Sequence, residues 1–342
     1  LISLKKMYSF ILISMNNFLL NISDLLIDNA NNKRLIILIN NLMESFKQIS
    51  NDMRDDKYLS STVGTSNSFG DEQLDIDVKT NDIIFESLKK SEVVHIGSSE
   101  ETPIEVECNP SNNLEKDKGF SVAFDPLDGS SIIDCNFAVG TICGIWEGSG
   151  IRNKKCSDMV CSMMSIYGPK TTLIIAFDKK LTKSNEYKCL ELVFKENEWI
   201  ITKESIQLEN EGKIFAPGNY GAVNENKNYK TVVDYWIKNN YKLRYSGGLV
   251  PDIYHILVKR KGIFTYFSNK SQNAKLRLIY EILPISLIVN ACNGKSLICS
   301  NDEGHSEICA DKIIDDLSER VNVCYGSKYE VEKFKEIYYK VN

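Results

Sequence analysis

Apolar residues follow two different periods along this chain, and the interleaving of the two predicts a mixed α/β protein. Residues 23–53 and 76–88 place apolar side chains every three or four positions, as one face of a helix does. Runs rich in β-branched residues predict strands at residues 93–96, 120–124, 136–146, 173–177, 191–194 and 199–202. Helices and strands interleaved in this way are typical of layered α/β folds.

A second, shorter unit follows residue 203. Its predicted elements are helices near 231–238 and 252–258, strands at 264 and 275–278, and a helix that begins near Pro284. A chain of 342 residues is longer than one compact core usually absorbs, so two packed subdomains are expected. We place them at residues 23–202 and 203–342, after an N-terminal extension of residues 1–22.

The N-terminal extension has two interpretations. Lys5 and Lys6 precede an uncharged run whose residues 8–15 have the length of a signal peptide's apolar core. That run is too short and too rich in Asn and Ser to span a bilayer, and Met7 and Met15 offer alternative starts. We favour a peripheral segment, either native or the result of a start site assigned too far upstream. The protein is then expected to be cytoplasmic and without a membrane span. Organelle targeting by this segment stays open.

Charge changes the picture of what the protein binds. The chain has 46 acidic and 41 basic side chains, which gives a formal net charge of −5. A general nucleic-acid coat protein needs a basic excess to neutralise phosphates, so that class is disfavoured. If some of the acidic side chains form a cluster, their carboxylates repel one another and need bound cations to stay close together.

The cysteines indicate thiols rather than a metal centre. Ten cysteines occur without a Cys-x-x-Cys pair, and there are only three histidines, so a structural zinc site is not expected. Most of the cysteines stand among apolar neighbours and are expected to be buried and reduced.

The most informative segment is Phe-Asp-Pro-Leu-Asp-Gly-Ser-Ser at residues 124–131. We expect a strand to end at Asp125 and Gly129 to allow a tight turn, which brings Asp125 and Asp128 together. Two adjacent carboxylates repel unless protonated or bridged by a cation, and Mg²⁺ suits such oxygen ligands. On these residues alone, a surface turn explains the segment equally well.

Further acids at predicted element ends shift that balance towards a metal site. Asp71 is placed to cap the helix that carries Asp77, Glu100 and Glu101 follow a strand, and Glu281 precedes the helix of Pro284. Gathered around one phosphate, these acids describe metal-assisted phosphoester hydrolysis, which needs no nucleophilic side chain.

Basic and aromatic residues offer a site for a second phosphate. The Lys-Leu-Arg-Leu run alternates with period two, which predicts that Lys275 and Arg277 share one face of a strand while the leucines enter the core. Arg244 and Tyr245 precede a Gly-Gly turn and suit a phosphate oxygen. Asn219 and Tyr266 are weaker candidates.

These segments together resemble the fructose-1,6-bisphosphatase superfamily of sugar phosphatases, which also includes the inositol monophosphatase-like enzymes. The resemblance rests on Asp-Pro-Leu-Asp-Gly-Ser-Ser, Gly-Asp at 70–71, Ser-Glu-Glu at 99–101 and the stretch 275–281. Within the superfamily, residues 67–74, 120–124, 131–137, 215–219 and 243–252 are closer to the sedoheptulose-1,7-bisphosphatase branch. The likeness covers about Leu25 to the C-terminus.

The resemblance implies a layered αβαβα sandwich that assembles as a homodimer or homotetramer. It assigns metal binding to Asp71, Glu100, Asp125, Asp128, Glu281 and the carbonyl of Leu127. It assigns Asp77 and Glu101 to the attacking water. It assigns the phosphates to Gly129, Ser130, Ser131, Asn219, Tyr245, Tyr266 and Lys275, with Arg244 reaching into a neighbouring subunit's site.

The expected function is therefore removal of the 1-phosphate of sedoheptulose 1,7-bisphosphate, with two or three Mg²⁺ ions per subunit or Mn²⁺ in their place. Fructose 1,6-bisphosphatase activity is the alternative, and a non-catalytic phosphosugar sensor is a second one. Ser60 and Thr65 stand near the places of a regulatory cysteine pair in plastid relatives, so we do not expect switching by that pair.

Overall fold

The structure of the protein is a computed structural model. It describes residues 22–54, 62–66, 72–110, 114–269, 274–299, 306–307 and 312–340. The predicted metal ligand Asp71 and nearly all of the N-terminal extension lie outside these residues.

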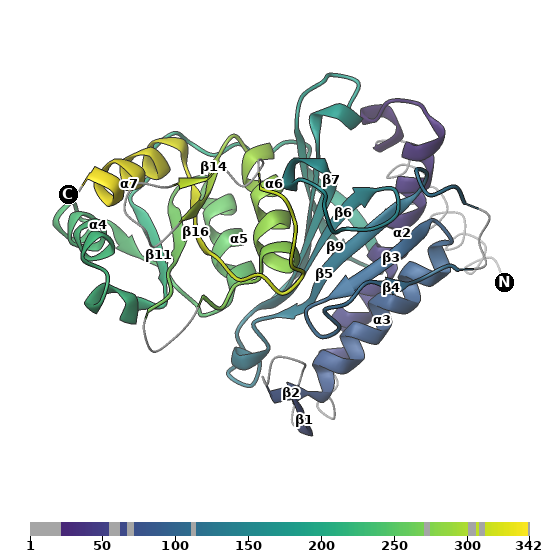
Figure 1. Cartoon of the computed structure of the whole chain (residues 1–342), viewed down its shortest axis with the longest axis horizontal. Helices are drawn as coiled ribbons and strands as arrows, with labels where there is room; N and C mark the ends of the chain where they lie inside the picture. The colour runs from purple at the N-terminus through teal and green to yellow at the C-terminus, as the bar shows by residue number, and fades with distance from the viewer. Residues whose placement is uncertain are drawn as a thin grey trace.

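An eight-stranded sheet forms the N-terminal half (Figure 1). Its strands are β3 (Val94–Ser99), β4 (Val106–Glu107), β5 (Phe120–Asp128), β6 (Val139–Glu147), β7 (Met159–Tyr167), β8 (Thr171–Phe177), β9 (Lys188–Lys195) and β10 (Glu198–Lys203). Their order is β10-β9-β8-β7-β6-β5-β3-β4, and only the β3–β5 pair is parallel. A separate antiparallel pair is formed by β1 (Thr62–Ser66) and β2 (Glu72–Leu74).

Two long helices cover the outer face of this sheet. They are α2 (Ala30–Asp52) and α3 (Asp75–Ser91). The side chain of Asn29 caps α2 by accepting the N–H of Asn32 at 2.7 Å. The buried faces of both helices share one core with alternate residues of β5 to β9.

A six-stranded sheet forms the C-terminal half. Its strands are β11 (Ile214–Gly218), β12 (Lys242–Leu243), β13 (Ile263–Tyr266), β14 (Lys295–Cys299), β15 (Ser306–Glu307) and β16 (Asn322–Gly326). The order is β12-β11-β13-β16-β14-β15, with β11 parallel to both of its neighbours. Helices α4 (Lys227–Lys238) and α7 (Lys328–Lys340) pack on its outer face.

A middle layer of two helices joins the sheets. Helices α5 (Leu249–Lys259) and α6 (Leu283–Ala291) lie between them, and a π-helical turn, Leu278–Ile282, leads into α6 (Figure 1). Their apolar side chains form one continuous core with residues of both sheets. The layers thus run helix, sheet, helix, sheet, helix, which confirms the predicted αβαβα sandwich. The division at residue 203 remains our proposal.

The sequence prediction of elements was incomplete or wrong in several places. It missed strands β7, β11, β14 and β16 and helix α7. The predicted strand at 275–278 is absent, since only Arg277 makes an isolated bridge and Leu278 already begins the π turn. Arg277 is 2% exposed, so it does not share an outer face with the exposed Lys275.

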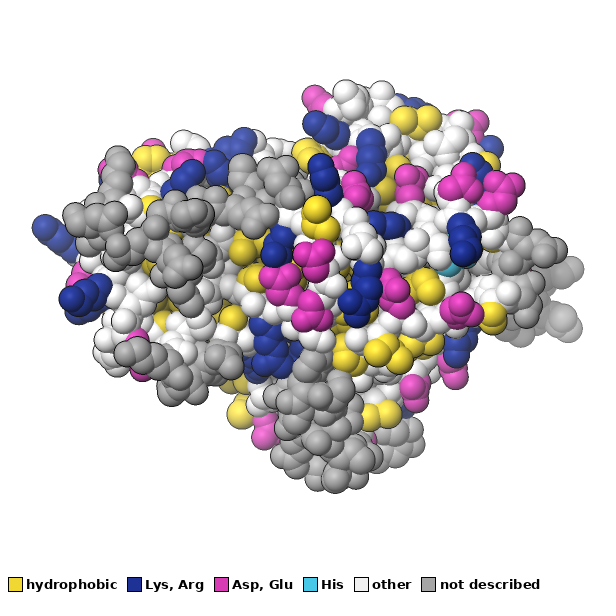
Figure 2. All heavy atoms as spheres, viewed as in Figure 1, with side chains coloured by type: hydrophobic (Ala, Val, Ile, Leu, Met, Phe, Trp, Pro, Cys, Tyr) yellow, Lys and Arg dark blue, Asp and Glu magenta, His cyan; other side chains and the backbone are white. Residues whose placement is uncertain are grey.

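The distribution of surface charge and the burial of the cysteines agree with the expectations from the composition. Figure 2 shows acidic and basic side chains interspersed on the face drawn, without a basic stripe. Nine cysteines in the described residues have thiol side chains rather than disulfides, and all but Cys135 are buried. Among the described helices, none has the length and apolar character needed to cross a bilayer.

Strand β5 contains the irregularity on which the acidic segment depends. Asp125 pairs with Ile142 and Asp128 with Gly140, so β5 has one residue more than β6 in this interval. Positions three apart in a regular strand face opposite sides, but one inserted residue returns both acids to the same side. Pro126, which has no N–H to leave unpaired, lies in the bulge. The strand therefore continues to Asp128 rather than ending at Asp125.

The hydroxyl of Thr141 supports this bulge. It donates to the Pro126 carbonyl at 2.8 Å and lies 2.9 Å from the Tyr167 hydroxyl, and all three groups are buried. We expect Thr141→Val to lower the free energy of unfolding by about 1–3 kcal/mol, because it leaves a buried carbonyl and hydroxyl without their partner. Urea denaturation measures this.

Thr80→Val is the matched control. Thr80 is equally buried, but its hydroxyl contacts only carbonyls of its own helix, at Ile76 and Asp77. Thr80→Val should lower the free energy of unfolding by less than half as much as Thr141→Val does. Equal losses for the two variants would contradict a special role of Thr141 at the bulge.

Candidate active site

A pocket of about 360 Å³ opens between the two halves, beside the ends of β5, β11 and β13. Its walls are formed by Glu100, Glu101, Asp125, Leu127, Asp128, Gly129, Ser130, Ser131, Asn219, Tyr220, Tyr245, Gly247, Gly248, Leu249, Phe264, Tyr266, Lys275, Leu276 and Glu281. Most of the site residues predicted from the sequence are in this one pocket.

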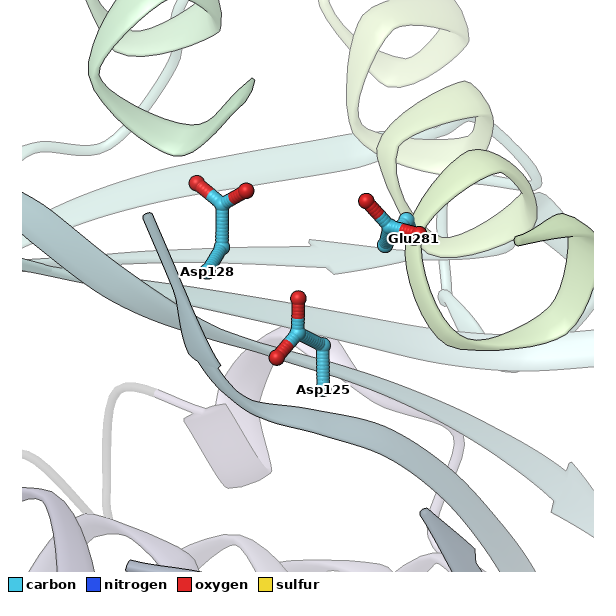
Figure 3. A group of neighbouring side chains, drawn as sticks. All are labelled: Asp125, Asp128 and Glu281. Atoms are coloured by element: carbon cyan, nitrogen blue, oxygen red, sulfur yellow. The ribbon is translucent and has the colours of Figure 1, made fainter. Parts of the chain in front are cut away.

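Three acids converge at the floor of the pocket (Figure 3). Asp125 and Asp128 come from the bulged end of β5, and Glu281 comes from the π turn before α6. One carboxylate oxygen from each lies within 4.8 Å of the others. Each side chain is at most 8% exposed, so little water screens their charges.

Asp128 is held by the first turn of α5. Its two carboxylate oxygens accept the backbone N–H groups of Leu249, at 3.2 Å, and Val250, at 2.6 Å. These amides are unpaired within the helix and lie at its positive end, so they favour the charged form of the acid. A residue of the first sheet thus depends on a helix of the middle layer.

Electrostatics disfavours three charged acids in this pocket. Burial, followed by the charges of Glu281 and Asp128, raises the pKa of Asp125 well above its usual range. Burial raises the pKa of Asp128 to about 6, against the opposing amides of Val250 and Leu249. Burial raises the pKa of Glu281 to about 7, although the charge of Arg277 lowers it. The positive charges of Arg277 and Lys275 therefore do not offset the burial of these acids.

Glu100 is placed differently from its sequence prediction. Its carboxylate forms an ion pair with the buried guanidinium of Arg277, although it also lines the pocket. The backbone N–H of Arg277 donates to Glu281 Oε2 at 2.5 Å. Arg277 thus joins two of the expected metal ligands, and a metal role for Glu100 stays a prediction.

The turn after Asp128 has the conformation expected from the sequence. Gly129 has φ +86°, a left-handed backbone that favours glycine, and Ser130–Ile132 form one turn of 3₁₀ helix. Gly129, Ser130 and Ser131 all line the pocket beside the acids.

The pocket is also lined by the residues predicted for a second phosphate, Asn219, Tyr245, Tyr266 and Lys275. Tyr245 is 44% exposed, whereas Tyr266 is buried, and burial raises its pKa to about 12. Asn219 has a left-handed backbone and donates from Nδ2 to the Phe267 carbonyl at 2.6 Å. The positive charge of Lys275 lowers the pKa of both Asp128 and Glu281, which places the ammonium near the acids.

Two predicted residues do not line the pocket. Asp77 is buried in the first turn of α3. Arg244 is exposed, and its Nη1 donates to the carbonyl of its neighbour Leu243 at 2.7 Å. Glu101 does line the pocket, and its charge contributes to the raised pKa of Asp125, after burial, Glu281 and Asp128.

Sequence reasoning missed the acid that supports the loop before α5. Asp252 is buried and accepts the N–H of Ser246 at 2.8 Å, and burial raises its pKa to about 7. Its position in the first turn of a helix was a signal for this contact. The pocket residues Tyr220, Gly247 and Gly248 carried no comparable signal.

The residues present fit a divalent cation. Buried carboxylates without a matching positive charge are costly, and hard oxygen ligands are those that Mg²⁺ and Mn²⁺ prefer. Among the described residues, Asp125, Asp128 and Glu281 form the group whose ligand atoms lie close enough to share one ion.

Comparison with known proteins gives the same assignment for both halves. The family model of the fructose-1,6-bisphosphatase N-terminal domain matches residues 13–204, and that of the C-terminal domain matches residues 208–339. A chloroplastic sedoheptulose-1,7-bisphosphatase of Triticum aestivum is 40% identical over 310 residues, which cover 90% of this chain and 74% of the relative. A class 1 fructose-1,6-bisphosphatase of Pelobacter propionicus is 35% identical over 309 residues, which cover 88% and 87%.

A solved structure agrees with these matches. A candidate sedoheptulose-1,7-bisphosphatase from Toxoplasma gondii superposes with a TM-score of 0.79 at 32% identity, covering 90% of this chain and 95% of its own. Fold, domain matches and relatives therefore agree, and the chain belongs to the fructose-1,6-bisphosphatase family.

Proposed function

We propose that the protein hydrolyses the 1-phosphate of sedoheptulose 1,7-bisphosphate to give sedoheptulose 7-phosphate and inorganic phosphate. The observation that carries the proposal is a single pocket lined by two unlike groups of residues. One group is the buried acids with the Gly129 turn, and the other is Tyr245, Tyr266 and Lys275. A sugar with two phosphates needs both groups.

Enzymes of this family depend on metal ions, and we assign Mg²⁺ to the acid cluster, with Mn²⁺ as a substitute. Asp125, Asp128, Glu281 and the Leu127 carbonyl would hold two or three ions, joined by Glu100 and Asp71. When bound, such ions polarise phosphoryl oxygens, lower the pKa of a water molecule and stabilise the leaving oxygen.

The remaining groups bind substrate and move a proton. Glu101 is assigned to the attacking water because it lines the pocket beside Asp125, and Asp77 is assigned to orient it. Backbone N–H groups of Gly129, Ser130 and Ser131 would donate hydrogen bonds to the oxygens of the scissile phosphate.

A second group of pocket residues would hold the distal phosphate. Lys275 supplies the charge, and Tyr245, Tyr266 and Asn219 supply hydrogen-bond donors. Arg244 is exposed and does not line this pocket, so we assign it to the site of a neighbouring copy in a homodimer or homotetramer.

Substrate length and location complete the proposal. The seven-carbon sugar is preferred because the Triticum aestivum relative is 40% identical, against 35% for the Pelobacter propionicus fructose-1,6-bisphosphatase. We propose a cytoplasmic protein, with an organelle as the alternative, since the Triticum aestivum relative is chloroplastic and residues 1–21 lie outside the described residues.

Phosphate release from the two bisphosphates tests the activity. With saturating Mg²⁺, kcat/KM for sedoheptulose 1,7-bisphosphate should exceed that for fructose 1,6-bisphosphate by about 10-fold or more, because the second phosphate must reach its binding wall. Asp128→Asn should lower kcat at least about 100-fold, since it removes a metal ligand. Asp234→Asn, on an exposed i,i+4 pair with Lys230, should be unaffected and serves as the control.

The outcomes separate the alternatives. A preference for the six-carbon substrate would make the protein a fructose-1,6-bisphosphatase. No phosphate release from either compound would favour the non-catalytic sensor. Undiminished turnover by Asp128→Asn would contradict the metal assignment.

The raised pKa values give a second prediction, on metal and pH. Asp128 and Glu281 have pKa values of about 6 and 7 in the folded protein, against about 4 in an unfolded chain. Without metal, their contribution to stability is complete below about pH 4 and falls as the pH rises towards 7. Metal binds the charged forms, so it should restore stability at high pH.

Thermal unfolding with and without Mg²⁺ measures this effect. Saturating Mg²⁺ should raise Tm by less than about 1 °C near pH 5 and by at least about 3 °C near pH 8. The increment should vanish in Asp128→Asn. An equal increment at both pH values would show that these acids are not the metal ligands.

A further inference from the structure

The π turn that carries Glu281 is held by a hydroxyl from the second sheet. We propose that the Tyr325 hydroxyl, assisted by that of Ser286, is a positioning group for Glu281 and acts through the carbonyl of Ile282. The inference rests on the proposed metal role of Glu281, and it concerns how rigidly the Glu281 carboxylate is oriented towards the other two acids.

The helix is wider than an α-helix where Glu281 lies. The N–H of Ile282 donates to the Arg277 carbonyl at 3.1 Å, and the N–H of Leu283 donates to the Leu278 carbonyl, both over five residues. Pro284 explains the widening. It has no N–H, and in an α-helix its ring would collide with the carbonyl of Tyr280, four residues earlier.

The wider turn decides where the Glu281 side chain points. In an ordinary capping box, a Glu accepts the N–H of the residue three positions earlier. Glu281 instead accepts the N–H of Arg277, four positions earlier, at 2.5 Å. The additional residue of the π turn permits this longer reach, and the same carboxylate joins Asp125 and Asp128.

Side-chain hydroxyls fix the backbone on both sides of Glu281. After it, the Ile282 carbonyl accepts the Tyr325 hydroxyl at 2.9 Å and the Ser286 hydroxyl at 2.8 Å. Before it, the Tyr280 hydroxyl lies 2.8 Å from Ser98 Oγ of β3. Glu281 is thus fastened to β16 of one sheet and β3 of the other.

The Tyr325 ring packs in the core, and its hydroxyl can be removed by mutation without removing the ring. The ring is fully buried and stacks on Phe264 with centroids 6.2 Å apart. Tyr325→Phe retains that packing and removes the bond to the Ile282 carbonyl. A hydrogen bond of this kind contributes about 0.5–1.5 kcal/mol, which corresponds to a factor of about 2–12 in an equilibrium constant.

The experiment is calorimetric titration of the full chain with Mg²⁺ alone, and separately with Mn²⁺ alone, without substrate. Tyr325→Phe should weaken metal binding about 3- to 10-fold, with KM for the bisphosphate unchanged. Ser286→Ala should weaken it in the same direction but less. Thermal unfolding checks that each variant is folded.

Tyr338→Phe is the matched control. Tyr338 is 2% exposed, and its hydroxyl accepts a hydrogen bond from Asn226 at 2.8 Å, in α7 on the outer layer. It should bind both metals as the wild type does.

Each result decides the proposal. Wild-type affinity in folded Tyr325→Phe overturns it, as does an equal loss in Tyr338→Phe. If Tyr325→Phe does not fold, wild-type affinity in Ser286→Ala overturns it instead. If the wild type binds neither metal, the proposed function fails and this inference fails with it, whereas a failure confined to the variants leaves the proposed function intact.

Discussion

The repulsion among three buried carboxylates is the constraint on which the rest of this structure depends. Asp125, Asp128 and Glu281 have oxygens within 4.8 Å of one another, and all three residues are buried. Burial raises all three pKa values, and the charges of neighbouring acids raise those of Asp125 and Glu281 further. Such a cluster is maintained only where other groups offset the cost, and those groups come from several layers of the fold.

The middle layer supplies most of that support. The first turn of α5 gives two amides to Asp128, and the π turn before α6 brings Glu281 and the buried Arg277. The same two helices form the apolar core between the sheets. The site is therefore complete only when both sheets have packed on the middle layer, which links the chemistry to the assembly of the whole chain.

The sequence predicted the layered fold and the acidic segment well, because periodicity and residue type carry those signals. Asp125 and Asp128 were expected to converge, but a β-bulge at Pro126 rather than a turn brings them together. The pattern of apolar and polar residues does not reveal such a shift in register. The alternation around Arg277 predicted a strand, but Arg277 is buried in an ion pair with Glu100, and Leu278 already begins the π turn. Backbone amides such as that of Val250 have no sequence signature, so the support of Asp128 was not predictable.

The central claim is that the acid cluster is a metal site, and anomalous X-ray diffraction from crystals grown with Mn²⁺ tests it most directly. The account predicts an anomalous peak bounded by Asp125, Asp128 and Glu281, each with an oxygen about 2.0–2.4 Å from the ion. A map without a peak there, or with Mn²⁺ bound only elsewhere on the protein, would contradict the account.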